Sequence, residues 1–427
     1  MSLLMIVVFV IGYVCIALEH PLRVNKSATA LILAALMWVF FALDDLSTSL
    51  HSPLLEHLGE VSEILFFLLG AMTIVEIIDA HGGFRIITDK ITTTKKTSLL
   101  WIVSFLTFFM SAVLDNLTTS IVMVALLRKL IDDKHDRWFY AGMVILAANA
   151  GGAWSPIGDV TTIMLWIGGK ISAGKIIMMT FLPSLVSILV PLTFLTFTMK
   201  GNVSRPKIVG TSRDELVLPG YQRRLMFFLG IGSLLFVPIF KTITHLPPYL
   251  GVLGGLGVLW LVTEIIHRNR LESESNQISV VAVLKRIDIS SILFFFGILM
   301  AVAALQTCGQ LEMLSQSLDK IPMEEPGKYY IIVSLIGLFS SIVDNVPLVA
   351  GAMGMYDFPM GHYFWEFLSY SAGTGGSILI IGSAAGVAVM GMEKIDFIWY
   401  LKKMSLLALA GFLTGGIVYI LQRSLFF

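Results

Sequence analysis

Long apolar segments recur along the whole chain, and short polar connections separate them. Most are close to the roughly 20 residues that an α-helix needs to span a hydrocarbon core about 30 Å thick. The pattern predicts membrane crossings near 2–18, 27–43, 61–80, 138–168, 176–199, 222–240, 250–266, 288–308, 362–392 and 404–424. The chain is therefore expected to be an all-α polytopic membrane protein.

Four apolar segments do not fit a plain helix. The crossings 138–168 and 362–392 are too long and too rich in glycine, so we expect a discontinuous helix in each. Two further stretches, 98–127 and 329–356, carry an Asp-Asn pair at their centres. We expect each of these stretches to form a re-entrant hairpin, which enters and leaves the membrane on the same side.

The distribution of basic residues favours the hairpin interpretation. If both hairpins are re-entrant, most of the 29 lysine and arginine residues fall on one face of the protein. The positive-inside rule then places that face in the cytoplasm and both termini outside, on the periplasmic side. A full crossing at 98–127 would put the basic clusters in 85–96 and 128–137 on opposite faces and spoil this pattern.

Composition narrows the class of protein further. Of the 427 residues, 56% are hydrophobic and 14% are charged, which is too little polar surface for a soluble protein of this length. The formal net charge is zero and gives no indication of nucleic-acid binding. Cys15 and Cys308 both lie inside apolar segments, so no disulfide framework is indicated. We find no nucleophile–base pair, metal-ligand cluster or phosphate-binding glycine loop, and we expect neither an enzyme nor a cofactor.

The chain also repeats itself, with an offset of 222 to 229 residues. The matched segments are 36–43 with 258–265, 63–72 with 291–300, 111–116 with 340–345, and 149–158 with 371–382. They divide the chain into repeats at 1–200 and 221–427, joined by a cytoplasmic linker at 201–220. Each repeat holds five crossings and one hairpin. Because five is odd, the second repeat must be inverted, an arrangement typical of secondary transporters with a site at the bilayer midplane.

The Asp-Asn pairs, Asp115-Asn116 and Asp344-Asn345, stand where a carboxylate is unfavourable. An ionised carboxylate in hydrocarbon costs at least about 2.5–3.5 kcal/mol, and non-helical backbone at that depth is tolerated only where it lines a cavity or the protein interior. Side-chain and backbone oxygens at such a tip suit a small, hard cation. The two pairs therefore predict a cation site.

The discontinuous helices supply further polar groups. The segment 149–162 contains Asn149, Asp159, Thr161 and Thr162. The segment 371–386 contains Ser371, Ser377 and Ser383 but no carboxylate. Because a carboxylate binds either a metal cation or a proton, and binding one disfavours the other, these acids make an exchanger plausible.

Simpler roles are open for several of these groups. The two hairpin aspartates can act in salt bridges or as hairpin caps, although no basic residue lies within the same hydrophobic stretch. Asp159 can cap the second half-helix, and serine or glycine in membrane helices often serves packing. Interfacial solvation accounts for the acidic residues near helix ends, which are Glu63, Glu76, Asp79, Glu264 and Glu366. Glu76 and Asp79, with the neighbouring His81, also suit proton access or pH sensing.

The motifs SAVLDNLTTS, NAGGAWSPIGDVTT, SSIVDNVPL and GGSILIIGSAAGVAVMG together resemble those of the NhaD-type sodium/proton antiporters of bacteria, within the ion transporter superfamily. The resemblance runs from about residue 60 to the C-terminus. It implies two inverted repeats, a scaffold that commonly forms a homodimer, and a transport domain that moves. It also implies roles in ion or proton binding for Ser111, Asp115, Asn116, Asn149, Asp159, Thr161, Thr162, Ser340, Asp344, Asn345, Ser371, Ser377 and Ser383.

Relatives that carry dicarboxylates have Ser-Asn-Thr at the hairpin tips, whereas this chain has Asp-Asn, which argues against an anionic substrate. We therefore expect a bacterial inner-membrane antiporter, embedded in lipid, that exchanges cytoplasmic Na⁺ and Li⁺ for external H⁺. The main Na⁺ ligands would be Asp115, Asn116, Asp159, Asp344 and Asn345. Two other functions stay open: a Na⁺-coupled symporter for an organic acid, and efflux of a neutral oxyanion such as arsenite.

Overall fold

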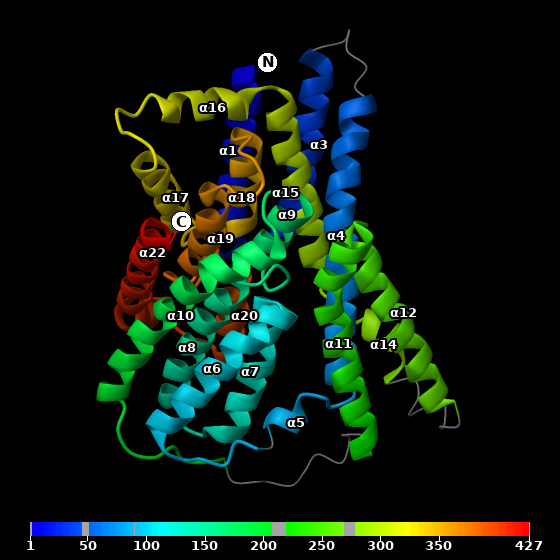
Figure 1. The fold of residues 1–427 in the computed structure, drawn as a ribbon, viewed down its shortest axis with the longest axis vertical. Coiled ribbons are helices and arrows are strands. Elements are labelled where there is room, and N and C mark those ends of the chain that lie inside the picture. Colours follow the sequence, from blue (N-terminus) through cyan, green and yellow to red (C-terminus); the bar gives the residue numbers. More distant parts are fainter. Residues whose placement is uncertain (1, 45–50, 89, 207–218, 269–277, 427) are drawn as a thin grey trace.

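The computed structural model describes residues 2–44, 51–88, 90–206, 219–268 and 278–426, and these residues form helices (Figure 1). The first group is α1 (Ser2–Ala17), α2 (Glu19–Leu22), α3 (Lys26–Asp44), α4 (His51–Ala80), α5 (Arg85–Thr88), α6 (Lys96–Leu114), α7 (Asn116–Leu130), α8 (Lys134–Ala153), α9 (Val160–Ile167) and α10 (Ala173–Thr198). The second group is α11 (Gly220–Thr244), α12 (Pro248–His267), α14 (Val280–Leu284), α15 (Ile289–Thr307), α16 (Gln310–Asp319), α17 (Gly327–Phe339), α18 (Asn345–Met355), α19 (Tyr363–Gly375), α20 (Ala384–Glu393), α21 (Phe397–Tyr400) and α22 (Leu406–Phe426).

The described residues contain eight helices that are long and apolar enough to cross a membrane and no β-strand. The spans with that length and composition are Lys26–Leu43, Pro53–Ala80, Lys96–Leu114, Ala173–Thr198, Gly220–Thr244, Pro248–His267, Ile289–Thr307 and Phe397–Phe426. The prediction of an all-α polytopic membrane protein is confirmed at this level.

Two groups of packed helices make up the molecule. In the first group, α3 packs against α1 and α15, and α4 packs against α11, α12 and α15. In the second, α8 lies against α6, α7, α10 and α19, while α22 packs on α10 and α17 packs on α19. Figure 1 shows the first group on the right and at the top, and the second on the left. Contacts of α4 with α6 and α9, and of α15 with α18, join the two groups.

Four helix pairs are interrupted where the sequence places polar motifs. Helix α6 ends at Leu114 and α7 begins at Asn116, so Asp115 alone separates them. The breaks between α8 and α9 and between α19 and α20 span 154–159 and 376–383, and α17 and α18 are separated by 340–344. Figure 1 shows α6 and α7 in the lower half of the molecule and α17 and α18 in the upper half.

Glycine allows these interrupted pairs to pack closely. A Cβ on Gly158 would lie 2.7 Å from the backbone oxygen of Ser111, at the end of α6. A Cβ on Gly382 would lie 2.5 Å from the backbone oxygen of Ser341, after α17. Each break therefore contacts the end of the helix that leads to an Asp-Asn pair.

Some elements differ from the expected ranges. Helix α4 begins at His51, ten residues before the predicted crossing. The prediction missed the segment 51–60 because it relied on hydropathy, and this helical segment is polar. Helix α16 lies in a connection for which the sequence analysis predicted no element. Most of the predicted linker, at 207–218, and the first part of the acidic connection, at 45–50, lie outside the described residues.

Candidate cation site

Asp159 accepts hydrogen bonds on both carboxylate oxygens at the break between α8 and α9. Its side chain is buried, with 1% of the residue exposed. Oδ1 accepts from the backbone nitrogen and from Oγ1 of Thr161, both at 3.0 Å, so Asp159 caps α9. Oδ2 accepts from the side-chain amides of Asn116 at 2.9 Å and Asn345 at 3.4 Å. A single carboxylate therefore meets an amide from each of the two Asp-Asn pairs.

The amide network continues from Asn116 to the second helix break. Nδ2 of Asn116 also donates to Oδ1 of Asn149 at 3.0 Å, and Nδ2 of Asn149 donates to Oγ of Ser383 at 2.9 Å. Ser383 in turn accepts from the backbone nitrogen of Gly386 at 3.1 Å and caps α20. Asn149 and Ser383 are 234 residues apart, so the network joins both halves of the chain.

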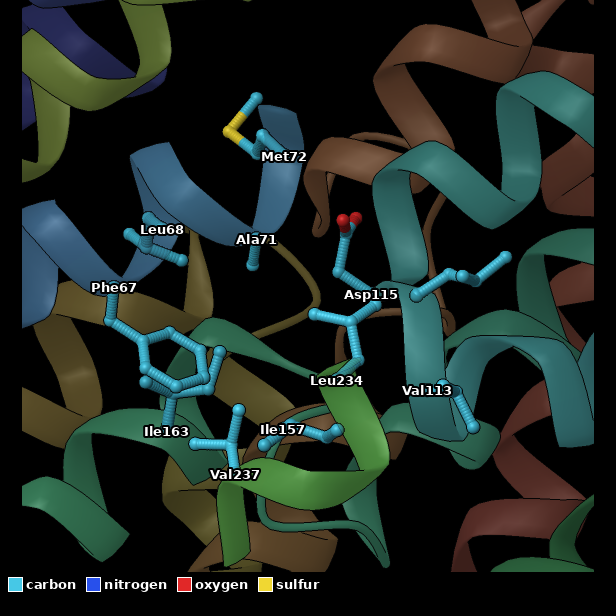
Figure 2. Close-up of a pocket in the computed structure, with 11 residues that line it drawn as sticks. Phe67, Leu68, Ala71, Met72, Val113, Asp115, Ile157, Ile163, Leu234 and Val237 are labelled. Carbon is cyan, nitrogen blue, oxygen red and sulfur yellow. The ribbon is translucent and has the colours of Figure 1, made fainter. Parts of the chain in front are cut away.

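Asp115 lies at the start of α7 and takes no part in that network. Its backbone has φ 87° and ψ 158°, a region that residues other than glycine rarely adopt, so the backbone is strained at this point. Thr118 donates its backbone N–H to Oδ1 and its hydroxyl to Oδ2, both at 2.8 Å. Figure 2 shows the carboxylate at a small pocket whose other lining residues are apolar, among them Phe67, Ile157 and Leu234.

Asp344 pairs with a lysine that the sequence analysis did not connect with it. Lys26 Nζ lies 3.1 Å from Oδ2 of Asp344, although the two residues are 318 positions apart. Oδ1 accepts from the backbone nitrogen of Val346 at 3.3 Å, so Asp344 also caps α18. The sequence analysis left a salt bridge and a cap open as simpler roles for this aspartate, and both are present, with the basic partner at the start of α3.

Four of the predicted site residues bond to groups outside this network. Ser111 and Ser340 donate to the backbone oxygens of Ala148 and Ala372, at 2.6 and 2.8 Å. Ser377 donates to the backbone of Thr374, and Thr162 bonds Ser369. A fifth, Ser371, has a buried hydroxyl with no hydrogen-bond partner among the described residues. In this conformation these hydroxyl groups support helix packing.

The three aspartates do not converge on one point. Within the described ranges, no group of three or more histidine, cysteine, aspartate or glutamate side chains is arranged to hold a metal ion. The central arrangement instead consists of one carboxylate and three amides: Asp159, Asn116, Asn345 and Asn149. In this conformation Asn116 and Asn345 turn N–H groups toward Asp159, which suits an ionised carboxylate with no cation bound to it.

The acidic residues near helix ends differ in their surroundings. Glu76 lies 3.7 Å from Arg286, and His81 contacts His267 with 3.0 Å between their Nε2 atoms. Glu366 is fully buried and pairs with Lys175 at 3.2 Å, so solvation does not account for it as the sequence analysis proposed. Its position at the start of α19 gave no sign of this burial.

Comparison with known proteins places these features in a family. A family model described as a citrate transporter matches residues 13–368. Sodium/proton antiporter 1 of Arabidopsis thaliana is 50% identical over 99% of this chain and 73% of its own length. Sodium/proton antiporter 2 of the same plant is 47% identical over 97% of this chain and 98% of its own length.

A bacterial relative matches less closely but over a similar extent. The Na(+)/H(+) antiporter NhaD of Alkalimonas amylolytica is 31% identical over 91% of this chain and 84% of its own length. The resemblance read from the four motifs is thereby confirmed. The chain belongs to the NhaD-type family of sodium/proton antiporters, within the wider family whose model is described as a citrate transporter.

Proposed function

We propose that this chain is a secondary transporter that exchanges cytoplasmic Na⁺, and also Li⁺, for external H⁺ by alternating access. One observation carries the proposal: the buried carboxylate of Asp159 receives an amide from each Asp-Asn pair, through Asn116 and Asn345. The relatives named as sodium/proton antiporters support the exchange of Na⁺ for H⁺.

The chemistry follows from the two faces of an asparagine amide. In the described arrangement the amide N–H groups of Asn116 and Asn345 point at Asp159, which suits an ionised carboxylate without a bound cation. Rotation of each amide by half a turn would present its oxygen instead, since one end donates and the other accepts. Two such rotations would place three oxygens around one Na⁺, and protonation of Asp159 would release it.

We further propose the membrane arrangement that alternating access requires. The repeats 1–200 and 221–427 would be inverted, with re-entrant hairpins at α6–α7 and α17–α18, the basic face in the cytoplasm and both termini outside. The placement of the two helix pairs in opposite halves of the molecule supports this (Figure 1). Asp115 and Asp344 would be the further exchanging acids, with the predicted hydroxyl groups completing coordination in another conformation.

The membrane potential contributes to transport if more than one proton moves per Na⁺. Each net charge that moves then couples to about 2.3 kcal/mol per 100 mV.

We propose that the protein is a multi-pass transporter in the inner membrane of a bacterium and that it forms a homodimer through the scaffold. Cross-linking in native membranes tests the dimer.

The main alternative is a Na⁺-coupled symporter for an organic acid, which the description of the family model favours. An anion site needs a cationic side chain that is not already neutralised, or a half-helix N-terminus that is free to bind it, and Asp115, Asp159 and Asp344 cap three of these N-termini. Lys26 is close to the hairpin tip, but Asp344 pairs with it. The exchange of cations therefore fits the charges of the site better.

Inverted membrane vesicles that contain the protein provide the test. A pH-sensitive dye is quenched by respiration, and Na⁺, Li⁺ or K⁺ is then added at several pH values. We expect prompt dequenching with Na⁺ and Li⁺, and its loss in Asp159→Asn and in Asp115→Asn. Asp133→Asn is the matched control, because Asp133 also caps a helix but is exposed. Absence of any cation response in folded wild-type protein would contradict the proposal, and citrate uptake would then be measured.

A further inference from the structure

The ammonium group of Lys26 occupies the immediate surroundings of the Asp344 carboxylate. The 3.1 Å separation is that of a direct ion pair, and the two side chains are 23% and 11% exposed. The ammonium also lies 4.4 Å from the ring centroid of Phe294, a cation–π contact with a fully buried ring. A carboxylate on one side and a ring face on the other form a site that recognises positive charge.

The backbone of Lys26 is held in place independently of this pair. Lys26 is the first residue of α3, where Oδ1 of Asn25 accepts from the backbone nitrogen of Ser27 at 2.8 Å. Ser27 Oγ donates to the backbone oxygen of Ser290, in α15, at 2.6 Å. The start of α3 is therefore fixed to the start of α15, and only the lysine side chain reaches the tip.

Helix stability does not explain a lysine at this position. The N-terminus of a helix carries partial positive charge, so a cation in the first turn is unfavourable. The pair with Asp344 compensates for that repulsion. Of the three aspartates Asp115, Asp159 and Asp344, Asp344 alone forms an ion pair with a basic side chain in the described part of the chain.

We propose that Lys26 is a tethered cation that holds the position at Asp344 which a transported cation would otherwise take. This inference rests on the proposed function, and it adds a residue that sets the affinity of the site. Lys26 would compete with Na⁺ and H⁺ for Asp344 and keep the apparent Na⁺ affinity low. Movement of the tip away from α3 and α15 would release the carboxylate.

The first test is the Na⁺ concentration that gives half-maximal exchange in vesicles, measured for Lys26→Gln and Lys26→Arg. Removing the competing charge in Lys26→Gln should lower this concentration about tenfold, since a neighbouring opposite charge alters ion binding to a carboxylate by at least that factor. Lys26→Arg keeps the charge and should stay close to wild type. Na⁺-dependent thermal stabilisation in detergent gives the same ranking without transport.

The second test removes the group for which Lys26 competes. Asp344→Asn should weaken Na⁺-dependent thermal stabilisation, because a cation ligand is lost. If Lys26 acts by occupying Asp344, adding Lys26→Gln to Asp344→Asn should give little of the tenfold gain expected in the wild-type background. A gain of the same size in both backgrounds would show that Lys26 acts independently of Asp344, and the inference is overturned. Lys26→Arg in the Asp344→Asn background controls for folding.

The outcomes separate this inference from the proposed function. A wild-type protein with no Na⁺ response in either assay contradicts the exchange of Na⁺ and the inference together. A wild-type protein that responds, with Lys26→Gln unchanged or with the same gain in the presence and absence of Asp344, overturns the role of Lys26 alone.

Discussion

Asp159 and Ser383 occupy the same place at the two helix breaks. Each is the extended residue before a second half-helix, with φ −145° and ψ 144° for Asp159 and φ −140° and ψ 152° for Ser383. Both side chains cap the helix that follows, and the amides of Asn116 and Asn149 connect them. One position carries a titratable acid and the other a hydroxyl, so the two breaks are alike in backbone and different in charge.

This difference predicts separate effects for the two residues. Ser383→Ala removes a helix cap and the partner of Asn149 but no charge, so we expect a loss of about 1 kcal/mol in stability with Na⁺/H⁺ exchange weakened but measurable. Asp159→Asn keeps a capping side chain but removes the charge, so exchange should be lost in a folded protein. Thermal unfolding and vesicle dequenching, measured on both variants, check this. Exchange that survives in Asp159→Asn would contradict the assignment of the titrating charge to Asp159.

The two asparagine tips should contribute unequally. Asn116 donates to Asp159 at 2.9 Å and also to Asn149, whereas Asn345 donates at 3.4 Å. In the proposed Na⁺-bound state each amide turns its oxygen to the cation, and we expect the asparagine nearer to Asp159 to contribute more. Because it removes that ligand, Asn116→Ala should raise the Na⁺ concentration for half-maximal exchange about tenfold, and Asn345→Ala should raise it less. The opposite order would contradict the geometry of the site.

Gly158 should tolerate no side chain. A Cβ there would lie 2.7 Å from the backbone oxygen of Ser111 and 2.8 Å from the Cα of Gly152, and backbone atoms cannot move aside cheaply. We expect Gly158→Ala to fold poorly and to show no exchange. Gly391→Ala is the control, because nothing lies within 4 Å of its Cβ position. Membrane yield and size-exclusion profiles of both variants measure the effect, and normal assembly of Gly158→Ala would count against this packing.

A buried glutamate should stabilise the end of the molecule where α7, α8 and α20 meet. Glu393 is 3% exposed, and its carboxylate lies 2.7 Å from Nε of Arg128 and 2.6 Å from Nε of Arg137. Glu393→Gln leaves two arginines without a counter-ion, so we expect a loss of about 2 kcal/mol. Asp357→Asn, which affects an exposed pair with Lys170, should leave the melting temperature unchanged.

High salt provides a check on this prediction. Screening acts mainly on exposed charges, so the effect of Glu393→Gln on the melting temperature should persist at 1 M salt. An effect that disappears there would mean that solvent reaches the pair.

The sequence predicted the fold class and the interrupted elements because both depend on local pattern. Apolar runs located the long helices, and Gly-Pro or Gly-Gly motifs located the breaks after Ala153 and Gly375. The polar residue types in the motifs identified the members of the network around Asp159. The central position of this carboxylate depends on which helices meet, and the local sequence pattern does not contain that information. For the same reason the partnership of Lys26 and Asp344, across 318 residues, left no local signal.

The polarity of individual serines was less informative. Ser371 and Ser377 stand in a glycine-rich motif, yet their hydroxyls lie against helix backbone or remain without a partner. A hydroxyl serves packing and ion coordination equally well, so composition does not distinguish them. Thr118 bonds both oxygens of Asp115. Its position three residues after an N-cap residue is a weak sequence signal for such an interaction.

The apolar pocket beside Asp115 bears on how an exchanger avoids wasting the ion gradient. Side chains such as Phe67, Leu234 and Val237 offer no partners to a hydrated ion, so a continuous file of water along this route is unfavourable (Figure 2). In the proposed exchanger, a cation that moved past Asp115 on this side would lose its hydration shell and gain no ligand from the pocket wall. The wall would therefore oppose a leak of Na⁺ through the protein at this point.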